Sequence, residues 1–419
     1  MEHVLLVRYA EIHLKGLNRP FFERALADRI VSALAPTKVR VVREQGRVFV
    51  LGVPAEEIDG AAKRVARVFG VHSVSPAVAV EKDWEAICAA CVPMVRAAAE
   101  GTGAGTFKVF ARRADKRFPM NSDEICRTMG GVLLDAIPAL SVDVHAPALK
   151  VGVEIRQTQA FVYARELPGV GGMPVGSNGR AMLLISGGID SPVAGYMIAK
   201  RGVKLYAVHF YSSPYTSEKA RDKVVELTRI VAGFAGDIDL YLVPFTEIQL
   251  AIYEQCPQSE TTVLMRRLMM ELAEHFALEC GAQALVTGES IGQVASQTIE
   301  SLTVTGDAVT LPVVRPLIGF DKEEIIDRAK AIGSFDTSIL PYEDCCTVFV
   351  PQHPVTSRSS RTSGGARRRW TLRPWWRRRY GRPSSCACCR KERDQTERAA
   401  GSFARGAFSL RTPYSRRNR

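Results

Sequence analysis

The sequence lacks the features that place a protein in a membrane or outside the cell. No run of eighteen apolar residues occurs among its 419 residues, which excludes an ordinary transmembrane helix. The N-terminal residues Met1–Leu5 do not form the basic segment and apolar stretch of a secretory signal. The ten cysteines show no spacing typical of a disulfide framework. We therefore expect a cytoplasmic protein with reduced thiols and no membrane partner.

The net charge of +12 is unevenly distributed along the chain. Residues 357–419 contain 18 arginines and 1 lysine against 3 acidic residues, which gives this segment a net charge of +16. The preceding 356 residues therefore carry a net charge of −4. A prediction of nucleic-acid binding must rest on local basic clusters and not on the total charge.

Hydrophobic periodicity predicts three regions before this basic tail. Residues 1–60 read as a strand, a helix and a hairpin, and residues 61–165 read as a second α+β unit. Five glycines and two prolines predict a linker or mobile loop over 166–180. Residues 181–356 alternate continuous apolar strands with helices, which predicts a parallel sheet with helices on both faces. The expected fold class is α/β, with two small α+β domains in front.

A glycine turn follows the first apolar strand of the third region, Ala181–Ile185. Pro192 suits the first turn of the helix that comes next. Backbone N–H groups of the turn and the N-terminus of the helix would form a cradle for phosphate. The P-loop pattern G-x-x-x-x-G-K-[ST] is absent, and a simple structural turn is the alternative. The residues expected to form the cradle are Ser186, Gly187, Gly188 and Ser191.

Asp190 places a carboxylate inside this cradle. Phosphates repel a carboxylate unless a cation lies between them, so we expect Mg²⁺ to bridge Asp190 and the phosphates. The alternative is that Asp190 caps the N-terminus of the helix, and the two roles are compatible.

The pattern S-G-G-I-D-S resembles the loop of the PP-loop ATP pyrophosphatases, which cleave ATP between the α- and β-phosphates and adenylate a substrate. Two segments narrow the resemblance to the tRNA 4-thiouridine synthetases: Thr287–Thr298, TGESIGQVASQT, and Arg8–Arg19, RYAEIHLKGLNR. In the second, Ala10 replaces the family's usual glycine. Lys108–Ser122 is similar to the family's THUMP domain. The resemblance covers residues 1–356 and implies a ferredoxin-like domain, a THUMP domain and a Rossmann-like PP-loop domain.

The resemblance also implies an ATP site, formed by residues that follow several strands and by one residue of a helix. Without it, His209 would be interpreted as a core histidine and Arg266 as part of a solvated helix face. Ligands of open α/β sheets bind at the carboxyl ends of strands, where all but Arg266 are expected. The implied residues are Leu184, Ile185, His209, Phe210, Arg266, Gly288 and Gln297.

Two pairs of cysteines have different interpretations. Sulfur transfer needs a thiolate or persulfide, and the resemblance favours Cys346 as the reactive residue with Cys345 as its neighbour. Without the resemblance, a buried structural pair is equally plausible. Cys88 and Cys91 match C-x-x-C, but they lie in a predicted helix without a second pair, so we expect a helix core and not a zinc site.

A basic cluster with interleaved phenylalanines occurs in the second region. A solvated loop is one interpretation, and the THUMP resemblance favours a tRNA surface that contacts phosphates. The cations are Lys108, Arg112, Arg113, Lys116 and Arg117, and the aromatic residues are Phe107, Phe110 and Phe118.

The resemblance implies an ATP-dependent tRNA sulfurtransferase. The O4 of uridine at position eight would attack the α-phosphate, pyrophosphate would leave, and sulfur would displace AMP to give 4-thiouridine. A cysteine desulfurase is the implied sulfur donor, and a thiamine sulfur-carrier protein is a further implied partner because family members also supply thiazole sulfur. No rhodanese domain is recognisable. Alternatives are another adenylating PP-loop enzyme that modifies tRNA, a THUMP-bearing methyltransferase, and a non-catalytic tRNA-binding protein.

The tail departs from the family pattern after Thr356. Residues 357–419 hold three of the four tryptophans and no helical period. A basic aromatic arm that grips RNA is one interpretation. We favour a frameshifted translation that was never selected to fold, and we expect disorder.

Overall fold

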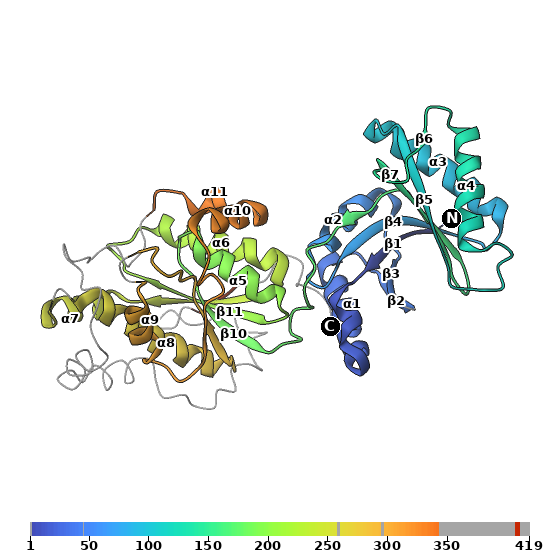
Figure 1. The fold of residues 1–419 in the computed structure, drawn as a ribbon. Helices are drawn as coiled ribbons and strands as arrows, with labels where there is room; N and C mark the ends of the chain where they lie inside the picture. The colour runs from blue at the N-terminus through green and yellow to red at the C-terminus, as the bar shows by residue number, and fades with distance from the viewer. Residues whose placement is uncertain (1, 45, 258–259, 295–296, 343–406, 411–419) are drawn as a thin grey trace. The chain divides into compact units, whose positions relative to one another are not determined.

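The computed structural model describes residues 2–342, except 45, 258–259 and 295–296, together with residues 407–410 (Figure 1). They form two compact units, and the chain passes from one to the other between Pro174 and Val175. None of the described helices is both long and apolar enough to cross a membrane.

The first unit is built on one nine-stranded sheet in the order β2-β3-β1-β4-β8-β7-β5-β6, with β9 beside β4. Its strands are β1 (Glu2–Arg8), β2 (Arg40–Glu44), β3 (Arg47–Leu51), β4 (Ser73–Val80), β5 (Thr106–Arg113), β6 (Ser141–Val142), β7 (Leu149–Ile155), β8 (Ala160–Tyr163) and β9 (Leu167–Pro168). Its helices are the 3₁₀ helices η1 (Glu11–Asn18) and η2 (Ala55–Glu57) and the α-helices α1 (Arg19–Leu34), α2 (Ile58–Ala66), α3 (Trp84–Thr102) and α4 (Ser122–Ala136).

All four α-helices pack on the same face of this sheet. Alternate strand residues point to opposite faces, and Leu5 and Val7 of β1 pack with α1 and α2. Val151 and Val153 of β7 pack in the same way with α3 and α4. The opposite face carries a separate apolar cluster made of strand residues, in which Phe49 stacks on Phe161. In the described part of the chain no helix contributes to that cluster.

The two predicted α+β regions share this sheet. Strand β4 pairs with β1 of the first region on one side and with β8 of the second region on the other. The boundary expected at residue 60 falls within α2. The whole helix packs with the first region, because Ala61 and Val65 are buried in the core of that region.

The predicted linker 166–180 is held by backbone hydrogen bonds. Gly169 and Gly171 donate to the carbonyls of His72 and Val71, and Met173 is buried in the first core. Gly176 donates to Gly202 in the second unit. The expectation of a mobile loop does not fit these bonds, since each half of the segment is attached to its own unit.

The second unit contains a six-stranded sheet in the order β14-β13-β10-β11-β12-β15. Its strands are β10 (Arg180–Leu184), β11 (Lys204–Tyr211), β12 (Ile238–Pro244), β13 (Ala284–Val286), β14 (Val313–Val314) and β15 (Ala407–Leu410). Its helices are α5 (Asp190–Lys200), α6 (Glu218–Ala235), α7 (Thr246–Gln255), α8 (Thr261–Glu279), α9 (Ile299–Gly306), α10 (Lys322–Ile332) and α11 (Phe335–Ser338).

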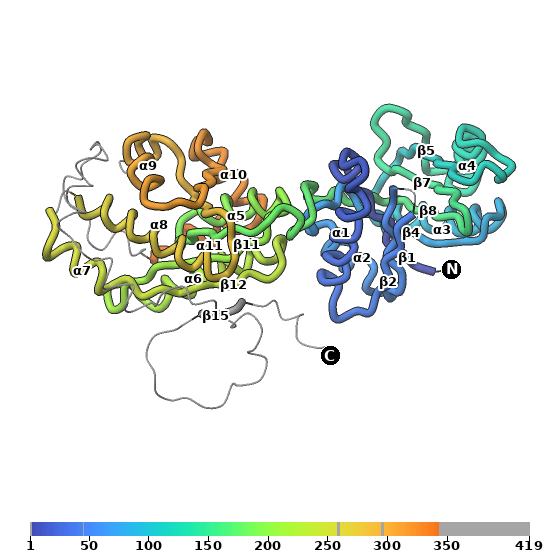
Figure 2. The backbone as a smooth tube through the Cα atoms, turned by 90° about the horizontal axis from the view of Figure 1, so that it is seen from below, coloured from blue at the N-terminus to red at the C-terminus, as the bar shows by residue number. Residues whose placement is uncertain are grey.

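Both faces of the second sheet are covered, as the continuous apolar strands predicted. Figure 1 shows α5 and α6 on one side of the sheet and α8 on the other. Helix α9 lies against α8 (Figure 2). Strands β10 to β14 are parallel. The α/β fold class is therefore confirmed, although the sequence interpretation did not anticipate α7 and α9.

The strand β15 belongs to the tail that was expected to be disordered. Residues 407–410 pair antiparallel with 238–241 of β12. A strand at the edge of a sheet has free backbone N–H and C=O groups that can pair in this way. The rest of the predicted tail, 357–406 and 411–419, lies outside the described residues.

Candidate active site

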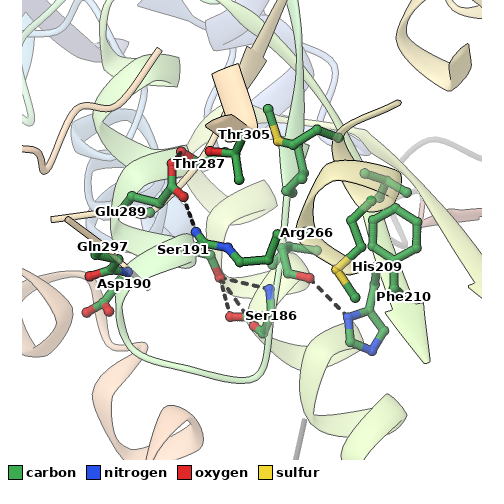
Figure 3. A pocket seen from close by; sticks show the side chains of 16 residues that line it. Ser186, Asp190, Ser191, His209, Phe210, Arg266, Thr287, Glu289, Gln297 and Thr305 are labelled. Atoms are coloured by element: carbon green, nitrogen blue, oxygen red, sulfur yellow. Dashed lines mark hydrogen bonds and ion pairs between the residues drawn. The ribbon is translucent and has the colours of Figure 1, made fainter. Parts of the chain in front are cut away.

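A cavity of about 310 Å³ lies at the carboxyl ends of β10, β11 and β13 (Figure 3). Ligand pockets of open α/β sheets occur at this edge, and their volumes begin near 300 Å³. The residues of the predicted nucleotide site that line it are Leu184, Ile185, Ser186, Asp190, Ser191, His209, Phe210, Arg266, Gly288 and Gln297.

Three predicted residues are not placed in the cavity wall. Gly187 and Gly188 lie in the loop between Ser186 and Asp190 and are not among the lining residues. Cys346, like its neighbour Cys345, lies outside the described residues, so its expected role stays a prediction.

Two serines close the predicted phosphate loop. The backbone N–H of Ser186 donates to Oγ of Ser191 at 2.9 Å, and Gly188 N–H donates to Oγ of Ser186 at 3.3 Å. These bonds hold the loop at the start of α5, where the N-terminus of the helix favours an anion.

Gly288 brings a second backbone segment close to the same helix end. A Cβ atom at this position would lie 2.7 Å from the backbone nitrogen of Ser191, nearer than real Cβ atoms approach. Only glycine therefore fits between β13 and the start of α5. The need for glycine here follows from packing, independently of any ligand.

His209 is almost fully buried at the end of β11. Its Nδ1 lies 3.0 Å from the carbonyl oxygen of Ile185, so Nδ1 carries the proton in this arrangement. The bond fixes the orientation of the ring at the cavity and ties β11 to the end of β10. The imidazole is thus both a core group and part of the cavity wall.

Arg266 points from α8 into the cavity and does not lie on a solvated helix face. It forms an ion pair with Glu289, which is 8% exposed. Glu289 also accepts hydrogen bonds from Arg315 Nε at 2.7 Å and Thr287 Oγ1 at 2.9 Å. One carboxylate thus serves two guanidinium groups, which leaves this part of the cavity with a positive charge suited to an anion.

Asp190 is the first helical residue of α5, and the N-cap position is occupied by Ile189 and not by Asp190. The capping interpretation is therefore wrong. The carboxylate instead accepts from Lys322 Nζ at 2.7 Å and from Gln293 Nε2 at 2.9 Å.

Asp190 fits the expected role as a magnesium ligand. No group of three potential metal ligands occurs within the described residues. Mg²⁺ commonly takes one or two protein carboxylates, with phosphate oxygens and water completing its shell. One carboxylate beside a phosphate loop matches that requirement.

The predicted RNA cluster lies on β5 and in the loop after it. Arg112, Lys116 and Arg117 are exposed. Lys108 is half-buried and donates to the carbonyl of Val144 at 2.9 Å. Arg113 differs from the others, since its guanidinium points inward to the carbonyls of Phe118 and Met120.

Asp115 anchors the loop that carries this cluster. Its carboxylate accepts from Arg117 and from Lys82 Nζ at 2.6 Å. These bonds, those of Arg117 first, hold the pKa of Asp115 well below its usual range. Arg117 therefore shares its charge with a carboxylate, whereas Arg112 and Lys116 have no ion-pair partner among the described residues.

Cys88 and Cys91 lie in α3, as expected for a helix core. Cys91 is buried, and burial raises the pKa of its thiol to about 12. A thiol with so high a pKa is unreactive near neutral pH.

Family models match the chain in the predicted order. A model described as ThiI ferredoxin-like domain matches residues 4–75, and a THUMP domain model matches residues 81–165. A third model, Thiamine biosynthesis protein (ThiI), matches residues 176–363.

A probable tRNA sulfurtransferase from Acetivibrio thermocellus is 56% identical over 360 residues, which cover 85% of this chain and 91% of the relative. Another from Lachnoclostridium phytofermentans is 52% identical, with the same coverage. The chain belongs to the tRNA sulfurtransferase family.

Solved structures agree with membership of the tRNA sulfurtransferase family. One match is the crystal structure of a 4-thiouridine synthetase–RNA complex with bound ATP. Its sequence identity to this chain is 36% and its TM-score is 0.84, and the match covers 90% of this chain and 97% of that chain. PH1313 from Pyrococcus horikoshii is 26% identical, with a TM-score of 0.61 over 79% of this chain and 99% of that chain.

Sequence reasoning about this tRNA sulfurtransferase missed three side chains of the site. Glu289 and Gln293 lie inside the Thr287–Thr298 motif that was recognised, so their position could have suggested a role. Lys322 has no such signal, because 132 residues separate it from Asp190.

Proposed function

We propose that the protein is an ATP-dependent sulfurtransferase that converts uridine at position eight of tRNA to 4-thiouridine. The uridine O4 attacks the α-phosphate of ATP and pyrophosphate leaves. The outer sulfur of a persulfide then forms a bond to C4 and the C4–O4 bond breaks, so that AMP leaves with the oxygen. A second thiol cleaves the S–S bond and releases 4-thiouridine, and free thiol, such as the cysteine supplied in the assay, reduces the disulfide that results. Adenylation is needed because a carbonyl oxygen is otherwise a poor leaving group.

One observation carries the proposal. The cavity at the carboxyl ends of β10, β11 and β13 gathers the S-G-G-I-D-S loop, His209, Arg266 and Gln297 in a chain of the tRNA sulfurtransferase family. These residues come from segments that are far apart in sequence. Their convergence at a helix N-terminus supports binding of a nucleotide with a phosphate chain.

The site residues have distinct proposed roles. The backbone N–H groups at the start of α5, where the loop Ser186–Ser191 ends, bind phosphate oxygens. Arg266 supplies a positive charge held in place by Glu289. Asp190 would hold Mg²⁺, which supplies charge neutralisation for the leaving pyrophosphate. The imidazole of His209 forms part of the cavity wall against which the nucleotide lies.

Cys346 is the proposed sulfur carrier, with Cys345 beside it. The sulfur would come from a cysteine desulfurase as a persulfide, and a thiamine sulfur-carrier protein is a further proposed partner. The description of the matching family model, thiamine biosynthesis, supports this second role. A cytoplasmic location follows from these partners.

The test is nucleoside mass spectrometry of tRNA incubated with the full chain, ATP, Mg²⁺, a cysteine desulfurase and cysteine. We expect 4-thiouridine to appear only when ATP is present. Folded protein that binds tRNA and yields only unmodified uridine would exclude the proposed reaction.

The two steps are separable through the cysteines. Cys346→Ala should leave tRNA-dependent pyrophosphate release largely intact and stop formation of 4-thiouridine, because the thiol acts only after adenylation. Cys345→Ala is the matched control and should have the milder effect. An inactive Cys345→Ala with an active Cys346→Ala would reverse the assignment.

A further inference from the structure

The face of the first sheet opposite the helices has two parts. Its centre is covered by the protein's own side chains, and its open end, at β5, is exposed. Strand pairing places Lys108, Phe110 and Arg112 of β5 on this face, beside Lys150, Gly152 and Glu154 of β7 respectively. These six residues are the ones that alternate with the buried, helix-facing side chains of both strands.

The centre of the face is filled by the protein's own side chains. The ring of Tyr163 lies so close over Gly152 that an added Cβ would be 1.9 Å from Cζ. The guanidinium of Arg8 lies 4.8 Å from the centroid of that ring. Glu154 is buried and takes ion pairs from Arg8, Arg47 and Arg156. A ligand therefore finds little free surface there.

The open end is different, because it exposes one aromatic ring among cations. Phe110 is 43% exposed, whereas Phe107 and Phe118 are 1% and 7% exposed. Lys108 Nζ lies 5.2 Å from the centroid of the Phe110 ring. Arg112 and Lys150 are exposed on the same face.

Two acids that lie near the cations of this end, Glu154 and Asp143, have other bonds. Glu154 has the three arginine partners named above. Asp143 accepts from the backbone N–H groups of His145 and Ala146 and lies near Lys108. The ring thus lies among cations that exceed the available carboxylates, which matches a polyanion that also carries flat apolar groups.

We propose that Phe110 is a stacking platform for an unpaired base of the RNA substrate, with Lys108, Arg112 and Lys150 contacting the phosphates around it. This inference rests on the proposed function, which provides the tRNA partner. Unpaired bases present a free face, which aromatic side chains bind by stacking, and phosphates on either side bind cations. Charge complementarity favours RNA over an apolar protein surface.

The experiment measures binding of fluorescently labelled tRNA to the full chain by anisotropy at several salt concentrations. Phe110→Ala should weaken binding about 5- to 100-fold. It should leave the salt dependence unchanged, because it removes no charge. Arg112→Ala should reduce the slope of log affinity against log salt by about 1. Phe110→Trp should retain binding because its ring can still stack.

The matched control is Leu134→Ala, which removes a 39% exposed apolar side chain from α4 on the opposite side of the sheet. It should bind tRNA like the wild type, and thermal melting should show that all three alanine variants are folded. Wild-type affinity in Phe110→Ala would overturn the inference, as would a loss equal to that of Leu134→Ala. Absence of tRNA binding by the wild-type chain would instead count against the proposed function.

Discussion

The two sheets of this protein differ in how they are covered, and this difference determines where each can bind a ligand. The sheet of the second unit has helices on both faces, so its faces are core and its free surface lies at the strand ends. The sheet of the first unit has helices on one face among the described residues, so its other face can meet a partner. The covered sheet has a cavity of about 310 Å³, and the half-covered sheet has an exposed basic and aromatic surface.

The chemistry of each site follows from this arrangement. At the strand ends, backbone N–H groups and a helix N-terminus converge on a small volume that suits the phosphates of a nucleotide. On the face of the first sheet opposite the helices, side chains two residues apart along β5 form a row that suits an extended polyanion. A change at one site should therefore leave the ligand of the other largely unaffected.

The largest expected effect is that of Asp190→Ala. Loss of the carboxylate removes the proposed magnesium ligand, so tRNA-dependent release of pyrophosphate should fall roughly 100-fold or more. The tRNA affinity should stay at the wild-type value, since the substitution lies in the other unit. A colorimetric pyrophosphate assay beside anisotropy checks both, and full pyrophosphate release would show that Asp190 is not needed.

Glu289→Gln should have the next largest effect. Arg266 and Arg315 would lose the carboxylate that they share, which should cost roughly 3 kcal/mol in the free energy of unfolding. ATP affinity should also fall about tenfold because Arg266 is no longer held in the cavity. Urea denaturation and calorimetric titration measure the two quantities, with Glu300→Gln at an exposed position of α9 as the control. Wild-type values of both would contradict the role of Glu289.

Gly152→Ala tests the packing at the centre of the sheet face opposite the helices. The new methyl group would displace the ring of Tyr163, which should destabilise the protein by about 1–3 kcal/mol. Gly131→Ala in α4 meets open space and should be neutral or slightly stabilising. The loss should be smaller when Tyr163 is already leucine, because the clashing ring is gone. An equal loss in that background would mean that the clash is not the cause.

The smallest expected effect concerns the loop that carries the basic cluster. The pKa of Asp115 is lowered in the folded protein, so its stabilisation is present above the unfolded pKa of about 3.9 and is lost as the pH falls through the folded value. Asp115→Asn should lower the urea midpoint by the same amount at pH 7 and at pH 5. Below pH 4, the difference between the midpoints of the variant and the wild type should shrink. Asp135→Asn is the control for loss of an exposed carboxylate. A difference that grows toward acid pH would reverse this assignment.

The sequence predicted those parts of the molecule that local pattern controls. Continuous apolar strands such as Ala181–Ile185 indicated a sheet covered on both faces, and the glycine turn with Pro192 indicated a helix start at a phosphate site. Strand alternation could also have separated buried Phe107 from exposed Phe110, since the two residues lie on opposite faces of one strand.

Contacts between distant segments could not be predicted in the same way. Lys322 reaches Asp190 only because α10 packs beside α5 in the folded unit. Arg113 looks like its basic neighbours in sequence, but the carbonyls that bind it belong to the loop after β5. The first two regions share one sheet because β4 pairs with β1 on one side and with β8 on the other. Strand β1 lies at the start of the first region and β8 near the end of the second, so the sequence pattern gives no sign of this pairing.

The most direct test of the difference between the two sheets is ultraviolet crosslinking of bound tRNA to the full chain, with the crosslinked residues mapped by mass spectrometry. Crosslinks in the first unit should fall on the open face, at Phe110 and beside it at Lys108, Arg112 and Lys150. They should persist when Asp190→Ala has removed the adenylation step. Crosslinks confined to helices α1 to α4, on the other face of the same sheet, would contradict the account.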